Sequence, residues 1–463
     1  MSDRVDRLDP APLGELVAQA AAAHHCPTVA WGIVLDGSLA ITDQIGDVSD
    51  RTVYRIASMT KSFSAAATLL LRDDGLLRLD DAVTDHAPEL VGLARGDAAP
   101  ITIRDLLTMT SGLPTDDPWA DRHLDLTDDE FDRIVTDGPL LAGATGDAWE
   151  YSNFGFAVLG RVVHRATGQR IQQVVTDRLL EPLAMTRTTW VRPGHDDWAR
   201  PMRWLEDGHV EELAPLADGL IAPMGGIWTT VADLATWVSW LDDAFPSRLG
   251  DDDGPLRRSS RRAMQSPQRF AGLRATRGIT SPGSYGFGLQ VVAEAQLGTV
   301  VAHSGGLPGY GSNMRWLPGR RTGAIALANV TYAPMAELTA RLFDELHAQG
   351  LVPDEVVPVS EHVEATAPRL IALINDWDDQ LASGLCTWSF LQDESCDRQR
   401  AAAERLAADV GPLTVTSIEA HTAARATIRC TGASETAVTV TFLLAPPSPA
   451  RIQSYTVTVD ADR

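Results

Sequence analysis

The sequence is almost without lysine. Lys61 is the only lysine among 39 lysine and arginine residues, and the other 38 are arginines. A guanidinium stays protonated at any working pH, whereas an ammonium removed from water loses its proton readily. The composition alone does not decide between chance and chemistry. The neighbours of Lys61 therefore have to show whether a lysine is needed there.

Positive charge, cysteine and long apolar runs are also scarce. The chain has 62 acidic residues and a net charge of −23, which disfavours nucleic acid and anionic lipid as partners. No apolar run approaches the roughly 20 residues of a membrane span, and the N-terminus lacks the features of a secretory signal. Four scattered cysteines are too few for a disulfide framework. These absences predict a soluble, cytoplasmic protein with reduced thiols and no membrane association.

Hydrophobic patterning predicts a first domain over residues 1–350. Asp36-Gly37 between two apolar runs indicates a β-hairpin. Residues 80 to about 280 mix short helices with loops, including a charged loop at 248–262. Strands at both ends of the region predict one sheet built from distant segments and flanked by helices. The expected elements are helices at 11–25, 59–72 and 335–348, and strands at 28–35, 38–45, 284–293, 297–303, 312–317 and 322–330.

A proline-rich segment, 351–367, is predicted to be a linker to a second, small α+β domain over residues 368–463. The sequence leaves open whether this domain covers the cleft, supplies a pocket wall or makes a homodimer contact. Its expected elements are helices at 368–382 and 397–409, and strands at 412–420, 424–430, 436–444 and 452–459.

Ser58 stands three residues before Lys61, at the start of the alanine- and leucine-rich segment 59–72. On a helix this spacing puts both side chains on one face, one turn apart. The helix N-terminus favours an oxyanion and disfavours a charged Lys61. A neutral Lys61 would accept the Ser58 proton and activate the hydroxyl as a nucleophile. A capping serine followed by a solvated lysine has the same spacing, so other residues must support this interpretation.

Tyr151-Ser152-Asn153 is the only Tyr-x-Asn sequence in the chain, and it precedes an apolar segment. A tyrosine hydroxyl near a nucleophile transfers a proton to the leaving group, and an asparagine amide holds a substrate carbonyl. The structural alternative is a buried tyrosine at a loop-to-helix junction.

His303-Ser304-Gly305-Gly306 ends an apolar strand. Paired glycines let a ligand approach the backbone, whose N–H groups then serve as oxyanion donors. The structural alternative is a histidine whose hydrogen bonds are satisfied within the protein at the end of the strand.

Taken together, Ser-x-x-Lys, Tyr-x-Asn and His-x-Gly resemble, in this order, the motifs of the serine β-lactamase and penicillin-binding-protein superfamily. The resemblance covers about residues 10–350 and extends to segments 53–63, 101–114 and 303–329. It is strongest to the class C β-lactamase-related serine hydrolases, which include esterases, D-aminopeptidases and DD-peptidases. The resemblance implies an α/β (α+β) fold of the β-lactamase/transpeptidase type, with an antiparallel sheet flanked by helices and a helical subdomain.

The same resemblance implies roles for individual residues. The implied catalytic residues are Ser58 as nucleophile, Lys61 as its base, Tyr151 as proton shuttle and His303 beside the substrate carboxylate or carbonyl. The implied substrate-binding residues are Asn153, Gly305 and Gly306, with the N–H groups of Ser58 and Gly306 forming the oxyanion hole. Whether Lys61 or Tyr151 takes the first proton stays open. Histidine in place of the family's lysine favours esterase, amidase or D-peptidase activity over efficient β-lactamase activity.

The predicted function is a serine hydrolase that acts through an acyl-enzyme on a small ester, amide or peptide, without metal or cofactor. Two alternatives share the same scaffold. One is an acyltransferase or peptide-cyclising thioesterase, and the other is a non-catalytic binding or regulatory module. The sequence contains no Gly-x-Ser-x-Gly, Gly-Lys or His-Glu-x-x-His, so α/β-hydrolase, P-loop and zincin sites are excluded.

Overall fold

The first apolar runs of the chain form a β-hairpin in the computed structural model, which describes residues 3–93, 99–194, 197–245, 252, 254–276, 279–354, 357–433 and 435–460. β1 (Val29–Leu35) is buried along its whole length, and β2 (Ser38–Ile45) is largely accessible. Asp36 and Gly37 join them with φ values of +53° and +76°. Two positive φ angles are what a type I′ turn requires. The predicted strands and turn are therefore confirmed.

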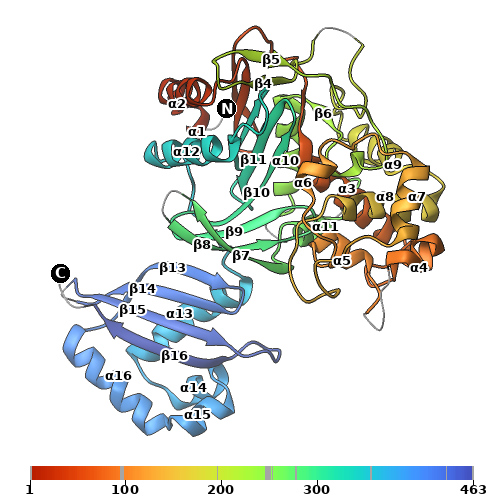
Figure 1. The fold of residues 1–463 in the computed structure, drawn as a ribbon. Coiled ribbons are helices and arrows are strands. Elements are labelled where there is room, and N and C mark those ends of the chain that lie inside the picture. The colour runs from red at the N-terminus through yellow and green to blue at the C-terminus, as the bar shows by residue number, and fades with distance from the viewer. Residues whose placement is uncertain are drawn as a thin grey trace. The chain divides into compact units, whose positions relative to one another are not determined.

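An eight-stranded antiparallel sheet forms the centre of the first compact unit, in the order β2-β1-β12-β11-β10-β9-β8-β7 (Figure 1). The further strands are β7 (Arg269–Thr276), β8 (Ile279–Tyr285), β9 (Gln290–Glu294), β10 (Gly298–Leu307), β11 (Tyr310–Leu317) and β12 (Thr322–Ala328). Two short pairs lie outside it, β3 (Tyr54–Arg55) with β6 (Trp228–Thr229) and β4 (Met202–Trp204) with β5 (Val210–Glu212). The sheet joins distant segments, because β1 pairs with β12 as well as with β2.

One strand prediction needs correction, and one hairpin was missed. The expected strand at 284–293 is in fact the end of β8, a turn, and β9. The β7–β8 hairpin was not predicted, because its strands carry Pro282 and Gly283 and its register shifts between Phe270 and Leu273. Such interruptions hide the alternation that identifies a strand.

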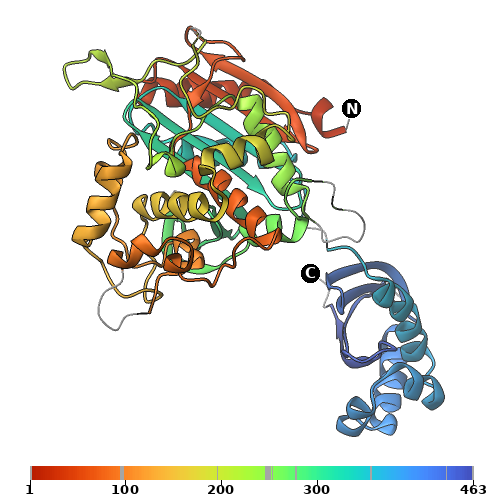
Figure 2. The same ribbon diagram turned by 90° about the vertical axis from the view of Figure 1, so that its right-hand side faces the viewer.

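Helices cover both faces of the sheet (Figure 2). α2 (Pro10–Ala23) and α12 (Met335–Ala348) share an apolar core with one face, through residues such as Leu13 and Leu342. On the other face, α10 (Val231–Asp242) and α3 (Thr60–Asp73) belong to the larger core. The remaining helices of this unit are α1 (Asp3–Asp6), α4 (Val83–His86), α5 (Ile103–Thr108), α6 (Asp117–Ala120), α7 (Asp128–Asp137), α8 (Phe154–Thr167), α9 (Ile171–Val175) and α11 (Arg258–Met264), with the short turns η1 (Ala57–Met59), η2 (Pro88–Leu93), η3 (Thr176–Leu180) and η4 (Ala222–Met224).

The charged segment predicted as a loop at 248–262 is helical in its last part, since α11 begins at Arg258. Arg261 in this helix is buried and donates to the carbonyl of Trp240, which a solvated loop would not allow. Residues 248–251 and 253 of the predicted loop lie outside the described residues.

The second compact unit comprises residues 354–463. It contains an antiparallel sheet in the order β13-β14-β15-β16 and a separate apolar core shared with its helices. The strands are β13 (Thr414–Thr422), β14 (Arg425–Thr431), β15 (Ala437–Leu444) and β16 (Ile452–Val459), and the helices are α13 (Glu361–Asn375), α14 (Asp379–Leu385), α15 (Trp388–Asp393) and α16 (Cys396–Val410). The small α+β architecture expected for this part of the chain is confirmed.

The predicted linker is wrong over its second half. α13 begins at Glu361, inside the segment 351–367, and one helix expected at 368–382 is in fact parts of α13 and α14. Ser360 caps α13 by accepting the N–H of Val363, and buried apolar residues then recur every three or four positions. Pro368 lies within the helix, where the sequence suggested a helix start.

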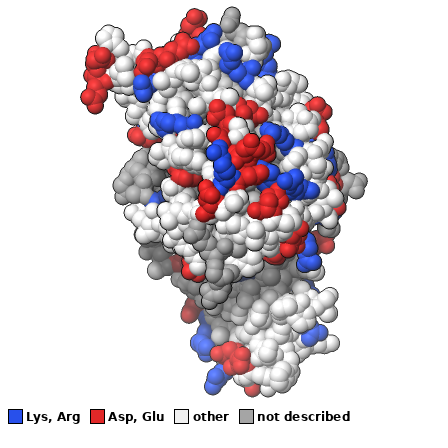
Figure 3. Space-filling view, turned by 45° about the vertical axis from the view of Figure 1, so that its right-hand side comes forward, with Lys and Arg blue, Asp and Glu red and all other residues white. Residues whose placement is uncertain are grey.

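Acidic side chains of the first unit are often paired with arginines. On the face drawn in Figure 3, Asp and Glu side chains lie beside arginines in mixed groups. Nη2 of Arg161, for example, lies 3.0 Å from Oδ1 of Asp128 and 3.1 Å from Oδ1 of Asp132. Among the described residues, no helix has the length and hydrophobicity needed to cross a bilayer.

Candidate active site

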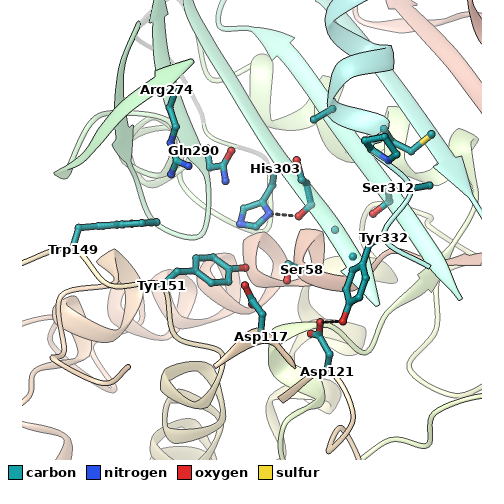
Figure 4. Close-up of a pocket in the computed structure, with 17 residues that line it drawn as sticks. Ser58, Asp117, Asp121, Trp149, Tyr151, Arg274, Gln290, His303, Ser312 and Tyr332 are labelled. Atoms are coloured by element: carbon teal, nitrogen blue, oxygen red, sulfur yellow. Dashed lines mark hydrogen bonds between the residues drawn. The ribbon is translucent and has the colours of Figure 1, made fainter. Parts of the chain in front are cut away.

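Ser58 is held where η1 runs directly into α3. Every residue of α3 from Thr60 to Leu71 is buried, so this helix is fixed by packing on all sides. Ala57, just before Ser58, has a φ of +50°, a conformation that is strained for a residue with a Cβ. The turn presents the Ser58 side chain to a pocket, as Figure 4 shows.

Lys61 is completely buried, and its Nζ lies near three oxygen atoms. The distances are 3.0 Å to Ser58 Oγ, 2.6 Å to Asn153 Oδ1 and 3.1 Å to the carbonyl oxygen of Met224. An ammonium donates to all three. A neutral amine keeps two donors for Asn153 and Met224, and its lone pair is then directed at the Ser58 hydroxyl. The contact expected from the i, i+3 spacing is therefore present.

Burial lowers the pKa of Lys61 to about 8, because the ammonium loses its hydration. The nearby carboxylates of Asp117, Asp121 and Asp116 act in the opposite direction and favour the charged form. The balance leaves Lys61 able to exchange a proton close to neutral pH.

The Asn153 side chain links Lys61 to Asp117. Its Oδ1 accepts from Lys61, and its Nδ2 donates to Asp117 Oδ1 over 2.7 Å. The side chain is fully buried and does not line the pocket. The expectation that Asn153 binds substrate stays a prediction, because one of the two N–H groups of its amide is left for a further acceptor. Asp116 fixes this segment by accepting the N–H groups of Asn153 and Phe154 at the start of α8.

Tyr151 lies beside both Ser58 and Lys61. Its ring centroid is 4.8 Å from Lys61 Nζ. Burial, reinforced by the neighbouring Tyr285, raises the pKa of the Tyr151 phenol well above its usual value, and a hydrogen bond with Ser58 only partly offsets this. The phenol therefore keeps its proton and acts as an O–H donor.

The hydrogen bonds and burial of His303 favour its neutral form. Its Nδ1 donates to the carbonyl of Ser304 over 2.7 Å, and its Nε2 accepts the hydroxyl of Tyr285 over 3.0 Å. Burial and the charge of Lys61 lower the pKa of His303 to about 3. The ring lines the pocket, but both of its nitrogens are already used.

Gly306 of β10 lines the pocket, and the strand pairing indicates the direction of its N–H. Leu307 and Tyr310 close a hairpin around the two-residue loop 308–309, and such a closing pair exchanges both of its hydrogen bonds. Because hydrogen-bonded and non-hydrogen-bonded pairs alternate along an antiparallel strand, the N–H of Gly306 is expected to point away from β11. β9 pairs with β10 only as far as Ala302, so among the described residues no strand pairs with Gly306 on that side.

Glycine is required at position 305, where the contact is with backbone, and at position 306 a side chain would displace the ring of Tyr332. A Cβ on Gly305 would lie 2.1 Å from the carbonyl oxygen of Ile56, and one on Gly306 would lie 2.6 Å from Cδ1 of Tyr332. At Gly305, β10 therefore packs closely against the segment that carries Ser58, a contact that the sequence analysis did not predict.

These groups border a pocket of about 440 Å³ that sequence reasoning described only in part. Ser58, Tyr151, His303, Gly305 and Gly306 line it as expected. The lining residues that the sequence did not indicate include Asp117, Asp121, Trp149, Arg274, Gln290 and Tyr332. They come from separate loops and strands, and no local spacing links them to the three motifs. Among the described residues, no group of three or more His, Cys, Asp or Glu side chains is placed to hold a metal ion.

Comparison with known proteins defines the class. The sequence model of the Beta-lactamase family matches residues 13–349. The chain therefore belongs to this family, within the superfamily of serine β-lactamases and penicillin-binding proteins, whose members are serine hydrolases.

Individual relatives are distant. The chain is 28% identical over 338 residues to Protein flp of Staphylococcus aureus (strain MW2). The aligned segment covers 70% of this chain and 63% of that protein. It therefore spans less than two thirds of the length of this relative. It is 26% identical over 323 residues to D-alanyl-D-alanine-carboxypeptidase/endopeptidase AmpH of Escherichia coli (strain K12), covering 65% of this chain and 79% of the relative.

Two solved structures share the fold. One is the octameric penicillin-binding protein homologue from Pyrococcus abyssi, with a TM-score of 0.64, 19% identity, and coverage of 98% of this chain and 97% of that one. The other is a D-stereospecific amidohydrolase from Streptomyces sp., with a TM-score of 0.59, 22% identity, and coverage of 72% and 97%. The predicted fold class is thereby confirmed.

Proposed function

We propose that the protein hydrolyses a small ester or amide through an acyl-enzyme formed on Ser58. The observation that carries this proposal is the 3.0 Å contact between Ser58 Oγ and Lys61 Nζ, made by a lysine that is fully buried. A lysine with a pKa lowered to about 8 is a usable base near neutral pH, whereas Tyr151, with its raised pKa, is a poor one. We therefore assign the first proton to Lys61.

In the proposed acylation, Ser58 Oγ attacks the substrate carbonyl while its proton passes to Lys61. The N–H groups of Ser58 and Gly306 stabilise the oxyanion. The bond to the leaving group then breaks, Tyr151 gives that group its proton, and Lys61 reprotonates Tyr151. Water next attacks the ester carbonyl by the same route, which releases the acid and restores Ser58 with its proton.

Two relatives carry names that indicate D-amino-acid amides or peptides, the carboxypeptidase AmpH and the D-stereospecific amidohydrolase. The neutral, internally bonded His303 offers no cation in the position where the family's lysine would stand. We therefore favour amide or ester substrates over β-lactams for this chain.

The test is covalent labelling with a fluorophosphonate, followed by intact mass measurement and peptide mapping. We expect one adduct on Ser58 in the native protein and none in Ser58→Ala or Lys61→Arg. Ser266→Ala is the matched control and should be labelled normally, because Ser266 lies outside the pocket. Ester turnover that persists in Ser58→Ala would overturn the proposal. Product analysis with an added amine separates hydrolysis from acyl transfer.

A further inference from the structure

One end of the pocket carries hydrogen-bond donors that the protein itself does not use. Arg274 on β7 has no carboxylate within ion-pair distance among the described residues, and the Gln290 side chain on β9 has no hydrogen-bond partner there. Nε1 of Trp149 is buried and is likewise without an acceptor. All three side chains line the pocket on the same side of Ser58 (Figure 4). Unused donors that include a guanidinium are suited to a carboxylate.

The other end carries a carboxylate that has no ion-pair partner among the described residues; the charges of Lys61 and Arg122 act on it without a direct ion pair. Asp121 is only 3% exposed, and its Oδ2 accepts the hydroxyl of Tyr332 over 2.8 Å. Its Oδ1 has no hydrogen-bond or ion-pair partner among the described residues. A buried carboxylate without an ion-pair partner is unfavourable, which raises the pKa of Asp121 to about 7, and a positively charged ligand group in contact with it relieves that cost. Asp121 and Tyr332 line the pocket on the side of Ser58 away from Arg274 (Figure 4).

The residues next to each end of the pocket indicate which part of the substrate would lie there. The Arg274 guanidinium lies 5.4 Å from the ring centroid of Trp149, and that ring lies 6.2 Å from the ring of Tyr151. Tyr151 protonates the leaving group in the proposed mechanism, so the Arg274 end lies on the leaving-group side. Tyr332 instead packs against Gly306, beside the carbonyl that would be acylated, so Asp121 lies on the acyl side.

We propose that the pocket selects substrates charged at both ends, with a free ammonium on the acyl group bound by Asp121 and Tyr332 and a free carboxylate on the leaving group bound by Arg274 and Gln290. This inference rests on the proposed function of Ser58 and adds its substrate class. Short peptides with both termini free have this distribution of charge.

The test compares alanyl-alanine, its N-acetyl derivative, its C-terminal amide and the doubly blocked compound, each in the D,D and L,L series. We expect the unblocked dipeptide to have the highest kcat/KM, and each block to reduce it by about 10- to 100-fold, as expected for losing a hydrogen-bonded charge pair. Equal rates for blocked and unblocked compounds would overturn the proposal.

Two variants, one at each end of the pocket, test which charged group of the substrate binds there. Arg274→Gln should abolish the preference for a free carboxylate and retain the preference for a free amine, and Asp121→Asn should do the reverse. Arg269→Gln, on the same strand, and Asp129→Asn, on α7, are matched controls that should keep both preferences, since neither residue lines the pocket. A variant that lowers all four rates equally would show a structural role and contradict the assignment.

Fluorophosphonate labelling separates this inference from the proposed function. If Ser58 is labelled but no dipeptide in either series is hydrolysed, the substrate class is wrong and the nucleophile stands. If Ser58 is not labelled, the proposed function itself fails.

Discussion

Replacing Asp117 with asparagine should increase the rate of the proposed hydrolysis at acid pH. Asp117 is the carboxylate that most favours the charged form of Lys61. The two groups are linked through Asn153, over hydrogen bonds of 2.6 and 2.7 Å, so their charges are at most about 8 Å apart. At an effective dielectric constant of about 20 this corresponds to about 2 kcal/mol, or about 1.5 pKa units. Asparagine keeps an oxygen that accepts from Asn153, so the geometry is retained.

The sign of the effect follows from the role of Lys61 as a base. Only the neutral amine accepts the Ser58 proton, so kcat/KM should rise with pH through about 8 in the native enzyme. Loss of the Asp117 charge should lower the midpoint to about 6.5 and increase kcat/KM at that pH by up to about 15-fold.

The assay is kcat/KM for an uncharged p-nitrophenyl ester between pH 5.5 and 9, because such a substrate does not itself titrate. Asp129→Asn provides the control for a lost surface charge and should leave the midpoint in place. A midpoint that stays near 8 in Asp117→Asn, or that moves upward, would refute the assignment of Lys61 as the base.

Three further predictions concern the scaffold of the site. Tyr285→Phe leaves Nε2 of His303 buried without a hydrogen-bond donor, so the free energy of unfolding measured in urea should fall by about 1–3 kcal/mol. An unchanged free energy of unfolding would contradict the neutral tautomer of His303 described above. Gly305→Ala places a methyl group against the carbonyl of Ile56 and separates β10 from η1; we expect a loss of at least about 100-fold in kcat/KM with unchanged circular dichroism, and retained activity would show that the contact is dispensable. A fragment lacking residues 354–463 should fold and be labelled on Ser58, because the two units have separate cores; a fragment that does not fold would refute this.

The parts of the fold that were predictable are those specified by neighbouring residues. The Asp36-Gly37 turn, the α3 segment and the strands of the second unit follow from local chemistry and alternation. The contact between Ser58 and Lys61 was also foreseeable, because i, i+3 spacing on a helix fixes it.

What could not be foreseen depends on chain segments that meet only in the folded protein. Arg274 reaches the pocket because the β7–β8 hairpin extends the sheet, and an irregular register hid that hairpin. The neutrality of His303 depends on Tyr285, and the internal use of Asn153 depends on Asp117. None of these pairs has a spacing that marks it in the sequence, so only tertiary structure reveals the second partner.

The pairing of β1 with β12 has a consequence for synthesis on the ribosome. The strand that begins at Val29 finds one partner at once in β2, but its other partner ends at Ala328. Ser58 and Lys61 are translated early, yet β10 with its N–H of Gly306 follows some 240 residues later. A nascent chain therefore carries the proposed nucleophile long before it has the proposed oxyanion hole, and the proposed site is complete only when nearly the whole first unit has emerged.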